Sequence, residues 1–531
     1  MDVNSSDEIS EQVFYKSCKN GSLATVEQLL THCDKLHLVD QLDKDGNSAL
    51  IVASENGHTK IVKLLLDYGA EVDQKNNDGQ SALMTASQNG HVKAVKLLLE
   101  CGAQIDVKDN GGKSALIVAS QNGHSKIVEL LLEYGAKEDL QSALRYIAAC
   151  QKQHPNTVKL LLEHGAQVDD DDDWYDQPAL VEASENGHTD IVKLLLENGT
   201  KKHLEWALIE AIRNKQFDII KLLLEHGALV DDDNDWFEQP ALVEASENGH
   251  IDIVQLLLEH GATEYLEALI EASVNGHTDI VKLLLEHVIR IDDDKHGIKD
   301  TLKQAVIKAS HYGHTEIVKL LLDYGAQVDL QDSYGWSALM VASQNGHTEV
   351  VKLLLHDYGA QANLQSNDGW SALIVASQNG HIEVVKLLHE HGAQVDLQDN
   401  DGWSALMVAS QNGNTEVVKP LHEYGAQVDL QNNNGRSALM AASQNGHTEV
   451  VKHLLDHGAR VDIQDYNGMS SLMMASQNGH HDITEVLLAH RAQVDLQNND
   501  GWSALMFAIW KSHIKIAETL LEHGALSLIH I

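Results

Sequence analysis

Apolar and polar positions along this chain follow one pattern that returns many times. An apolar run such as SALMVAS, which begins at Ser337, is followed by the turn letters QNGH, and a second run, EVVKLLL, begins at Glu349. Each run predicts a short helix with one apolar face. About ten mostly polar residues then lead to the next copy, and they include an Asn-Asp-Gly turn signal that ends at Gly369. The pattern therefore predicts helix, turn, helix and a hairpin finger.

Residues that start and stop helices stand at the ends of these runs. Ser337 can cap the first helix, which extends through Asn345, and Gly346 can take the left-handed backbone conformation that ends it. Thr348 is predicted to cap the second helix, and Gly359 to close it.

The unit recurs about every 33 residues along nearly the whole chain. One helix pair cannot bury its apolar face alone, so neighbouring copies must stack and share a core. We therefore predict an all-α solenoid of about sixteen helix-turn-helix units with short β-hairpin fingers. Clear copies begin at Ala53, Ala86, Ala119, Ala342, Ala376, Ala409, Ala442 and Ala475, and weaker ones at Ser17, Ala149, Ala183, Ala211, Ala245, Ala272, Ala309 and Ala508.

Differences between copies divide the chain into four segments. Residues 1–36 are interpreted as an N-terminal capping repeat, and residues 37–136 as regular repeats. Residues 137–309 are irregular, because connections such as GAKEDLQSAL leave too few residues for a finger and alternate with long acidic ones. Residues 310–531 are again regular and end in an atypical terminal repeat.

Two local departures predict altered second helices, and a third lengthens the spacing between two copies. Val288 and Ile289 replace the usual Gly-Ala, which removes the left-handed stop and makes this the expected bend or boundary. One residue is inserted near Asp357. Pro420 stands inside a second helix, where one backbone hydrogen bond must be lost and a kink is expected.

The frame D-x-x-G-x-S-A-L-x-x-A-S-x-N-G-H-x-x-V-V-K-L-L-L-x-x-G-A resembles the ankyrin repeat over nearly the whole chain. The family's Thr-Pro-Leu-His tetrad is replaced here by Ser-Ala-Leu followed by Met, Ile or Val. The serine can still cap the helix, but the first-turn proline with its fixed φ is missing. Each unit is therefore expected to be somewhat less stable than one with the family consensus.

Composition narrows the partners and the setting. The chain has 79 acidic and 38 basic residues and a formal charge of −41, which would repel nucleic acid and anionic membrane surfaces. The four cysteines, the polar start and the lack of a long apolar run favour a reduced, intracellular and cytoplasmic setting. Other proteins remain as the expected partners, and the oligomeric state stays open.

The 32 histidines raise the question of a metal site. Most of them occupy the NGH turn or the EHG helix end, and copies of one position lie about 10 Å apart. Zinc ligands must instead lie within about 2.1 Å of one ion. We therefore predict structural roles for these histidines and no bound metal.

Three acidic clusters, Asp169–Asp173, Asp231–Asp235 and Asp292–Asp294, raise the question of calcium. A calcium loop wants glycine at its sixth position and glutamate at its twelfth, whereas counting from Asp231 gives Trp236 and Leu242. Solvated finger tips, which can attract a basic partner, are the preferred interpretation. No phosphate loop, nucleophile elbow or HExxH motif is present, so neither catalysis nor a cofactor is predicted.

Four tryptophans mark the candidate binding surface, because they follow the finger glycine at a slot where other copies carry Asn, Gln, Lys, Arg or Met. Resemblance to the family implies that this slot and the two residues before the first turn line a concave groove. The alternative, that each indole packs on the neighbouring finger, stays open. The candidate residues are Trp336, Gln344, Asn345, Trp370, Gln378, Asn379, Trp403, Gln411, Asn412, Arg436 and Trp502.

The leading functional hypothesis is an intracellular scaffold or adaptor whose groove binds an extended protein segment. A second hypothesis is a substrate-recognition region of a larger enzyme or channel subunit, because ALSLIHI from Ala525 does not resemble a polar terminal cap. A third is a mechanical spacer, which would not require tryptophans gathered in one half.

Overall fold

The computed structural model describes residues 4–32, 38–168, 177–231, 240–291 and 295–526. Within these ranges the chain is helical, and β structure is limited to isolated bridges at the fingers, such as Gln331 with Ser337. The chain divides into two compact units, residues 1–245 with 252–263, and residues 246–251 with 264–531. No helix of the described part has both the length and the apolar character needed to span a membrane.

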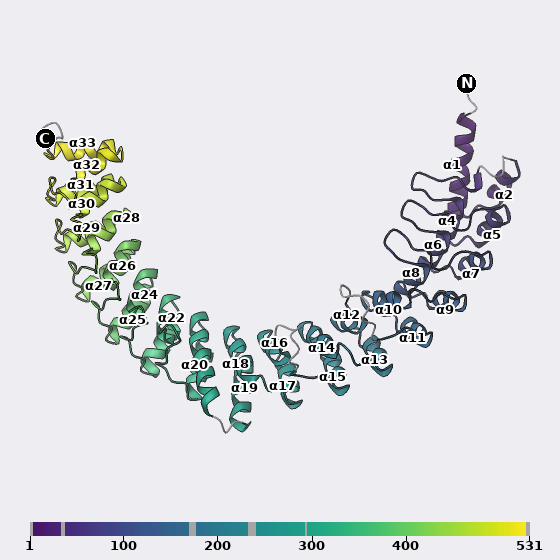
Figure 1. Cartoon of the computed structure of the whole chain (residues 1–531), viewed down its shortest axis with the longest axis horizontal. Helices are drawn as coiled ribbons and strands as arrows, with labels where there is room; N and C mark the ends of the chain where they lie inside the picture. The colour runs from purple at the N-terminus through teal and green to yellow at the C-terminus, as the bar shows by residue number, and fades with distance from the viewer. Residues whose placement is uncertain (1–3, 33–37, 169–176, 232–239, 292–294, 527–531) are drawn as a thin grey trace. The chain divides into compact units, whose positions relative to one another are not determined.

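The first unit is a series of short helix pairs, labelled in Figure 1. Its helices are α1 (Asn4–Asn20), α2 (Leu23–His32), α4 (Ala49–Glu55), α5 (Thr59–Asp67), α6 (Ala82–Gln88), α7 (Val92–Glu100), α8 (Ala115–Gln121), α9 (Ser125–Glu133), α10 (Leu140–Ala148), α11 (Pro155–Glu163), α12 (Ala179–Glu185), α13 (Thr189–Glu197), α14 (Leu204–Arg213) and α15 (Phe217–Glu225). The division between the units falls within the next pair, α16 (Ala241–Glu247) and α17 (Ile251–Glu259).

The second unit continues the same alternation. Its helices are α18 (Tyr265–Val274), α19 (Thr278–Ile291), α20 (Lys295–Tyr312), α21 (Thr315–Asp323), α22 (Ala338–Gln344), α23 (Thr348–Lys352), the π-helix η1 (Leu353–Asp357), α24 (Ala372–Asn379), α25 (Ile382–Glu390), α26 (Ala405–Asn412), α27 (Thr415–Glu423), α28 (Ala438–Asn445), α29 (Thr448–Asp456), α30 (Ser471–Asn478), α31 (His481–Ala489), α32 (Ala504–Trp510) and α33 (Ile514–Glu522).

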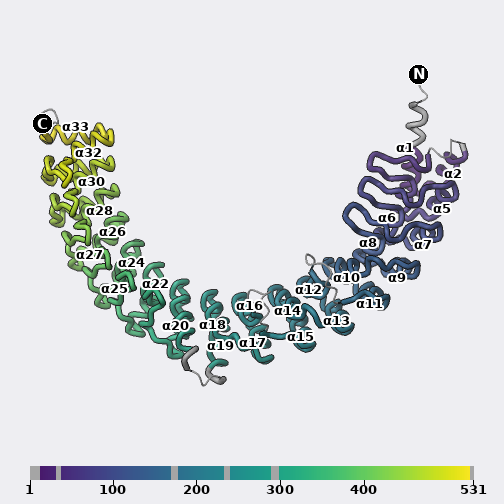
Figure 2. The backbone as a smooth tube through the Cα atoms, viewed as in Figure 1, coloured from purple at the N-terminus to yellow at the C-terminus, as the bar shows by residue number. Residues whose placement is uncertain are grey.

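Helices within each unit pack in two layers. First helices contact the first helices of the next pair, as α4, α6 and α8 do, and second helices such as α5, α7 and α9 form the other layer. The backbone trace in Figure 2 follows this alternation from pair to pair. Ala342, Val351 and Leu354 are fully buried where the layers meet. The core is therefore built in series by neighbours, as the repeat predicts.

The first-helix caps are confirmed. The Ser337 hydroxyl accepts a hydrogen bond from the Met340 N–H at 3.3 Å, and Gly346 has a φ of +72°. The second-helix cap was wrong, because His347 rather than Thr348 occupies that position and its carbonyl accepts from Val351 at 3.0 Å. The Thr348 hydroxyl instead donates to the Gly346 carbonyl at 3.4 Å.

The fingers are tight turns that also bond to one another. In one finger the Asp332 N–H donates to the Trp336 carbonyl at 2.9 Å, and the N–H of Asn367 in the next finger donates to Tyr334 at 3.0 Å. Glutamines add a second link, since Gln331 Nε2 donates to the Gln365 carbonyl at 2.8 Å. The same glutamine bond recurs from Gln365, Gln398, Gln431 and Gln464 to the next copy.

Two irregular connections differ from the regular repeat, and the compact units do not divide at Val288 and Ile289, the expected bend or boundary. Helix α10 begins at Leu140, four residues after Ala136, so no finger fits between them. Without a glycine stop, α19 runs through Val288 and Ile289 to Ile291, whereas most second helices have nine residues. The division between the compact units falls one repeat earlier, between residues 245 and 264.

Two second helices of the C-terminal unit absorb local changes. Pro420 is buried inside α27, which continues to Glu423 although the proline offers no N–H to the preceding turn. The residue inserted near Asp357 produces η1, where α23 widens into a π-turn. As a result, Ala360 donates to the carbonyl six residues back, whereas Ala326 of the preceding repeat donates five residues back.

Candidate protein-binding surface

The backbone of each finger fixes the slot in which the tryptophans stand. The Trp336 N–H donates to Asp332 Oδ1 at 2.8 Å and the Trp403 N–H to Asp399 Oδ1 at 2.7 Å, while the Trp370 N–H uses Ser366 Oγ at 3.1 Å. Arg436, Met469 and Trp502 make the same bond in their fingers. Because the slot residue contributes only its main-chain N–H to this bond, the bond does not depend on which side chain the slot carries.

The surroundings of Asp399, the acceptor in the Trp403 finger, shift the pKa of its carboxyl group. Burial raises the pKa of the Asp399 carboxyl, and the backbone N–H groups of Trp403 and Asp401, which donate to the carboxylate, counteract that rise. The carboxyl group is thus committed to shaping the finger.

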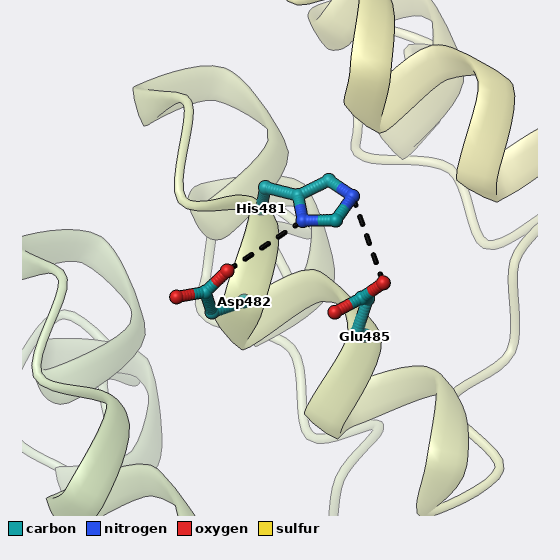
Figure 3. A group of neighbouring side chains, drawn as sticks. All are labelled: His481, Asp482 and Glu485. Atoms are coloured by element: carbon teal, nitrogen blue, oxygen red, sulfur yellow. Dashed lines mark ion pairs between the residues drawn. The ribbon is translucent and has the colours of Figure 1, made fainter.

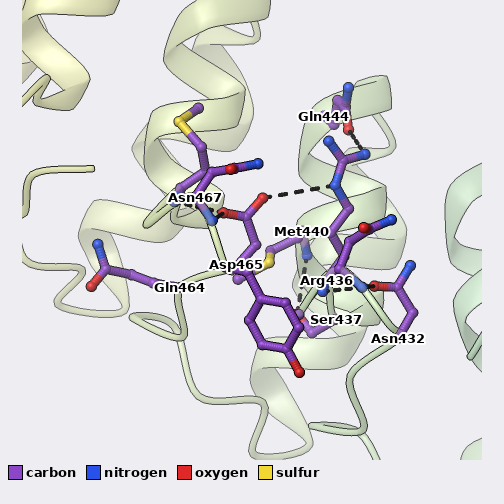
Figure 4. Close-up of polar contacts among 12 residues, drawn as sticks. Asn432, Arg436, Ser437, Met440, Gln444, Gln464, Asp465 and Asn467 are labelled. Carbon is purple, nitrogen blue, oxygen red and sulfur yellow. Dashed lines mark hydrogen bonds and ion pairs between the residues drawn. The ribbon is translucent and has the colours of Figure 1, made fainter. Parts of the chain in front are cut away.

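The slot residue lies beside the last turn of its own first helix. Arg436 Nη1 donates to Gln444 Oε1 at 3.1 Å (Figure 4), and Lys113 Nζ in the other unit donates to Gln121 Oε1 at 3.2 Å. Both pairs are eight residues apart, the offset that also separates Trp336 from Gln344. We call the slot and last-turn residues of the C-terminal unit the stripe: Trp336, Gln344, Trp370, Gln378, Trp403, Gln411, Arg436, Gln444, Met469, Gln477, Trp502 and Trp510.

The single charged side chain of the stripe is paired within the fold. Arg436 Nε lies 3.8 Å from Asp465 Oδ2 in the next finger, and the Asp465 side chain is only 1% exposed (Figure 4). The remaining stripe residues are amides, aromatics and a methionine. The indoles of Trp336, Trp370 and Trp403 are half-buried. The stripe therefore offers neutral aromatic and amide groups in a strongly acidic protein.

The last repeat adds an aromatic cluster that sequence reasoning missed. The Trp502 ring lies 5.3 Å from Phe507 and 5.7 Å from Trp510, measured between ring centroids. Trp510 is 58% exposed, and Lys511 Nζ stands 4.0 Å above its ring. The available signal was the eight-residue offset, because Trp510 replaces the glutamine of the earlier copies.

The predicted asparagines serve the helix ends. Asn345 Nδ2 donates to the Val341 carbonyl at 2.8 Å, and Asn379 Nδ2 donates to Val375 at 2.9 Å. Asn412 Nδ2 reaches the neighbouring repeat, where the Gln378 carbonyl accepts at 2.9 Å. These three side chains therefore have a structural task in addition to any contact with a ligand.

The turn histidines link consecutive repeats. His381 Nε2 lies 3.0 Å from the Gln344 carbonyl and His447 Nε2 lies 2.9 Å from the Gln411 carbonyl, and since a carbonyl only accepts, each Nε2 carries the proton. Gly346 leaves room for this contact, because a Cβ there would stand 2.6 Å from His381 Nδ1. The predicted structural role of the turn histidines is confirmed.

One group among the described residues brings three possible metal ligands within 4.8 Å of one another: His481, Asp482 and Glu485. In Figure 3 the imidazole stands between the two carboxylates. Nδ1 is 3.6 Å from Asp482 Oδ1, and Nε2 is 3.7 Å from Glu485 Oε1. The Asp482 and Glu485 side chains are 83% and 58% exposed, and exposed carboxylates commonly gather without an ion, so we assign no metal here.

The acidic clusters fall mostly outside the described residues, at 169–173, 232–235 and 292–294. Asp231 is described, and its Oδ2 accepts from the Thr263 N–H at 2.7 Å and from the Thr263 hydroxyl at 2.8 Å. This carboxylate therefore joins two repeats of the same unit.

Comparisons with known proteins agree with the repeat pattern. A search of curated sequences found no match, and one similar solved structure is the crystal structure of human ASB11 ankyrin repeat domain, 26% identical, with a TM-score of 0.39 over 42% of this chain and 98% of that one. The sequence model described as Ankyrin repeats (3 copies) matches residues 1–76, 69–142, 139–205, 203–267, 269–366, 356–432, 373–465, 407–498 and 439–528. Since these stretches cover nearly all of the sequence, the chain belongs to the ankyrin repeat family.

Proposed function

We propose that this protein is an intracellular scaffold or adaptor that uses the stripe to bind an extended segment of a partner protein. Ankyrin repeats are in general protein–protein interaction modules. The observation that carries the proposal is the slot itself, where the finger needs only a backbone N–H yet tryptophan stands at Trp336, Trp370, Trp403 and Trp502. The finger makes this bond with other residues in the slot, so its folding does not require the indole. We infer that the indole instead contacts a ligand.

The chemistry of the stripe suits a peptide in an extended conformation. Successive indoles are expected about 10 Å apart, the distance between packed helices, and an extended chain advances about 3.3 Å per residue. An apolar side chain at roughly every third residue can therefore meet successive tryptophans. Glutamine amides such as Gln344 and Gln378 can donate to and accept from the main chain of the ligand. Aromatic anchors surrounded by neutral polar groups are typical of binding hot spots.

Two further properties of the chain fit a protein partner inside the cell. Cys18, Cys101 and Cys150 are free thiols, as expected in a reduced cytoplasmic setting. The formal charge of −41 disfavours nucleic acid and anionic membrane surfaces as ligands.

A test begins with selecting peptides from a random display library on the whole chain. Affinity is then measured for a variant carrying Trp370→Gln and Trp403→Gln, which places in both slots the residue that Gln80 supplies in another copy. We expect a loss of at least about 1–2 kcal/mol in binding and unchanged helicity. The matched control is Gln80→Asn, which should leave affinity intact.

Thermal unfolding of the same variants separates the two interpretations of the indoles. If Trp370→Gln and Trp403→Gln lower stability and leave affinity unchanged, the indoles pack between fingers and the stripe is not the binding surface.

A further inference from the structure

Three imidazoles meet where two repeats of the C-terminal unit join. His422 lies on α27, whereas His453 lies on α29 and His457 follows it, and these helices are neighbours (Figure 1). The His422 centroid is 5.7 Å from that of His453 and 4.4 Å from that of His457, and the latter two are 4.1 Å apart. The three histidines occupy three different positions within the repeat unit. They can therefore lie closer together than the turn histidines, which occupy one position and are a full repeat apart.

Two nitrogens in this cluster have no hydrogen-bond partner among the described residues. His422 Nδ1 and His453 Nε2 are buried and lack a partner, whereas His457 Nδ1 lies 2.7 Å from the His453 carbonyl. A protonated imidazole needs an acceptor at both nitrogens, and these two positions supply none. The cluster is therefore built for neutral rings.

Charged groups around the cluster do not compensate for added protons. Burial lowers the pKa of His453, and the neighbouring His457, His422 and Lys419 lower it further, against a rise caused by Asp456. Asp456 also contacts the next repeat, because its Oδ1 lies 3.6 Å from Nε2 of His490, the residue that follows α31.

The second helices packed on this joint carry carboxylates that contact other side chains. Glu383 of α25 lies 2.8 Å from Lys386, and Asp482 and Glu485 of α31 lie 3.6 and 3.7 Å from His481. From α25, His389 faces α27 and stacks on Tyr424 at 3.7 Å. The first helices α26 and α28, with sequences ALMVASQN and ALMAASQN, carry no titratable side chain.

We propose that His422, His453 and His457 form an acid-sensitive joint, at which protonation separates α29 and the repeats that follow it from α27. Protons would place positive charges on rings 4.1–5.7 Å apart, with unpaired donors between two helices that are held by nearest-neighbour contacts. The array would then open at one defined place.

The sign of the pH dependence follows from the direction of the shift. Since the folded state lowers the pKa of His453 below its ordinary value of about 6.5, the unfolded joint binds protons more readily. The contribution of the His453 ring to stability is full above about pH 6.5. It is lost as the pH falls below that value toward the folded pKa.

Opening at this joint would also divide the stripe. Trp403 and Gln411 belong to the repeat before the joint, and Arg436 and Gln444 to the repeat after it. A ligand that spans both repeats would then be released in acid, a consequence that rests on the proposed function. The joint itself is tested without any ligand.

Hydrogen exchange of the whole chain at pH 7.5 and pH 5.5, corrected for intrinsic exchange rates, gives the test. The variant combines His422→Leu, His453→Leu and His457→Tyr, and these replacements are the residues of sister repeats at Leu455, Leu387 and Tyr424. We expect acid to speed exchange in α27, α29 and α31 at least about tenfold in the native chain and much less in the variant.

His391→Tyr is the matched control, because His391 occupies the same unit position as His457 two repeats earlier. It should leave the acid response unchanged. Equal acid-induced exchange in the native chain and the triple variant would show that these histidines do not form an acid-sensitive joint. Acid-induced opening with unchanged binding of selected peptides would retain the joint and show that the ligand does not bridge it.

Discussion

At the scale of single residues, the NGH turn combines two demands on one glycine. Gly346 has a positive φ and also faces the His381 ring, whereas Gly392, with a φ of +83°, has no atom within 4 Å of the Cβ position. Substitutions at these two glycines therefore distinguish the cost of a positive φ from the cost of a close contact with the ring.

We predict that Gly392→Ala lowers the free energy of unfolding by about 1–2 kcal/mol, the cost of a left-handed alanine. Gly346→Ala should cost about 1 kcal/mol more, because the new Cβ displaces His381 from the Gln344 carbonyl. Urea unfolding of both variants checks this. Equal losses would show that the contact with the ring is unimportant.

A second prediction uses the copy in which asparagine replaces the turn histidine. Asn414 Nδ2 donates to the carbonyls of Ser377 and Gln378 at 3.0 and 2.9 Å, so an amide can make the same link. His447→Leu should therefore cost about 1 kcal/mol and His447→Asn clearly less, as measured by denaturant midpoints. If both variants lose the same stability, the bond to Gln411 contributes nothing.

Single residues also show what the sequence could and could not predict. Ser337 and Gly346 were correct because their roles depend on local backbone chemistry. The cap predicted at Thr348 was wrong by one position, because the residue before the second helix is His347. Trp510 was missed because its meaning depends on a contact across the first helix, which the bond between Arg436 and Gln444 reveals.

At the scale of one element, α27 carries a defect that its neighbours avoid. Pro420 occupies the position of Leu387 in the preceding repeat and has no N–H for the Glu416 carbonyl. We predict that Pro420→Leu raises the free energy of unfolding by about 1–3 kcal/mol. The reverse change, Leu387→Pro, should lower it by about 3 kcal/mol, and thermal unfolding of the pair tests both. No gain from Pro420→Leu would show that α27 has already relaxed around the proline.

The place of the inserted residue within the second helix could not be predicted from the sequence. The insertion near Asp357 was visible in the spacing, but a loop or a longer helix could equally have absorbed it. The structure places it within the helix as η1, and in this arrangement Leu354 and Leu355 are buried. Burial in a core shared with neighbouring repeats cannot be read from the spacing of one repeat.

At the scale of the whole molecule, the repeats differ in how many links they share. Fingers of the C-terminal unit are joined by the glutamine bonds and by the finger N–H bonds, whereas the connections before Leu140, Leu204 and Tyr265 are too short for a finger. Most of the fold could be predicted from periodicity. The relative strength of its joints could not, because it depends on bonds between residues more than thirty positions apart.

We predict that unfolding occurs in several steps and that residues 137–309 open before residues 310–526. Denaturation followed by circular dichroism should not coincide with the change in tryptophan fluorescence. Hydrogen exchange should show lower protection in α14 than in α26. A single transition seen by all probes would contradict the nearest-neighbour description.

The glutamine bonds have a consequence for how such an array can grow. Gln398 donates to the carbonyl of Gln431, which in turn donates to Gln464, and both steps span 33 residues. Each repeat therefore brings a donor for one neighbour and an acceptor for the other. If recombination within the gene copies thirty-three codons, the new unit arrives with both halves of its junction and needs no compensating substitution. Duplication within the gene can therefore lengthen this protein by whole repeats, and each longer version can still fold.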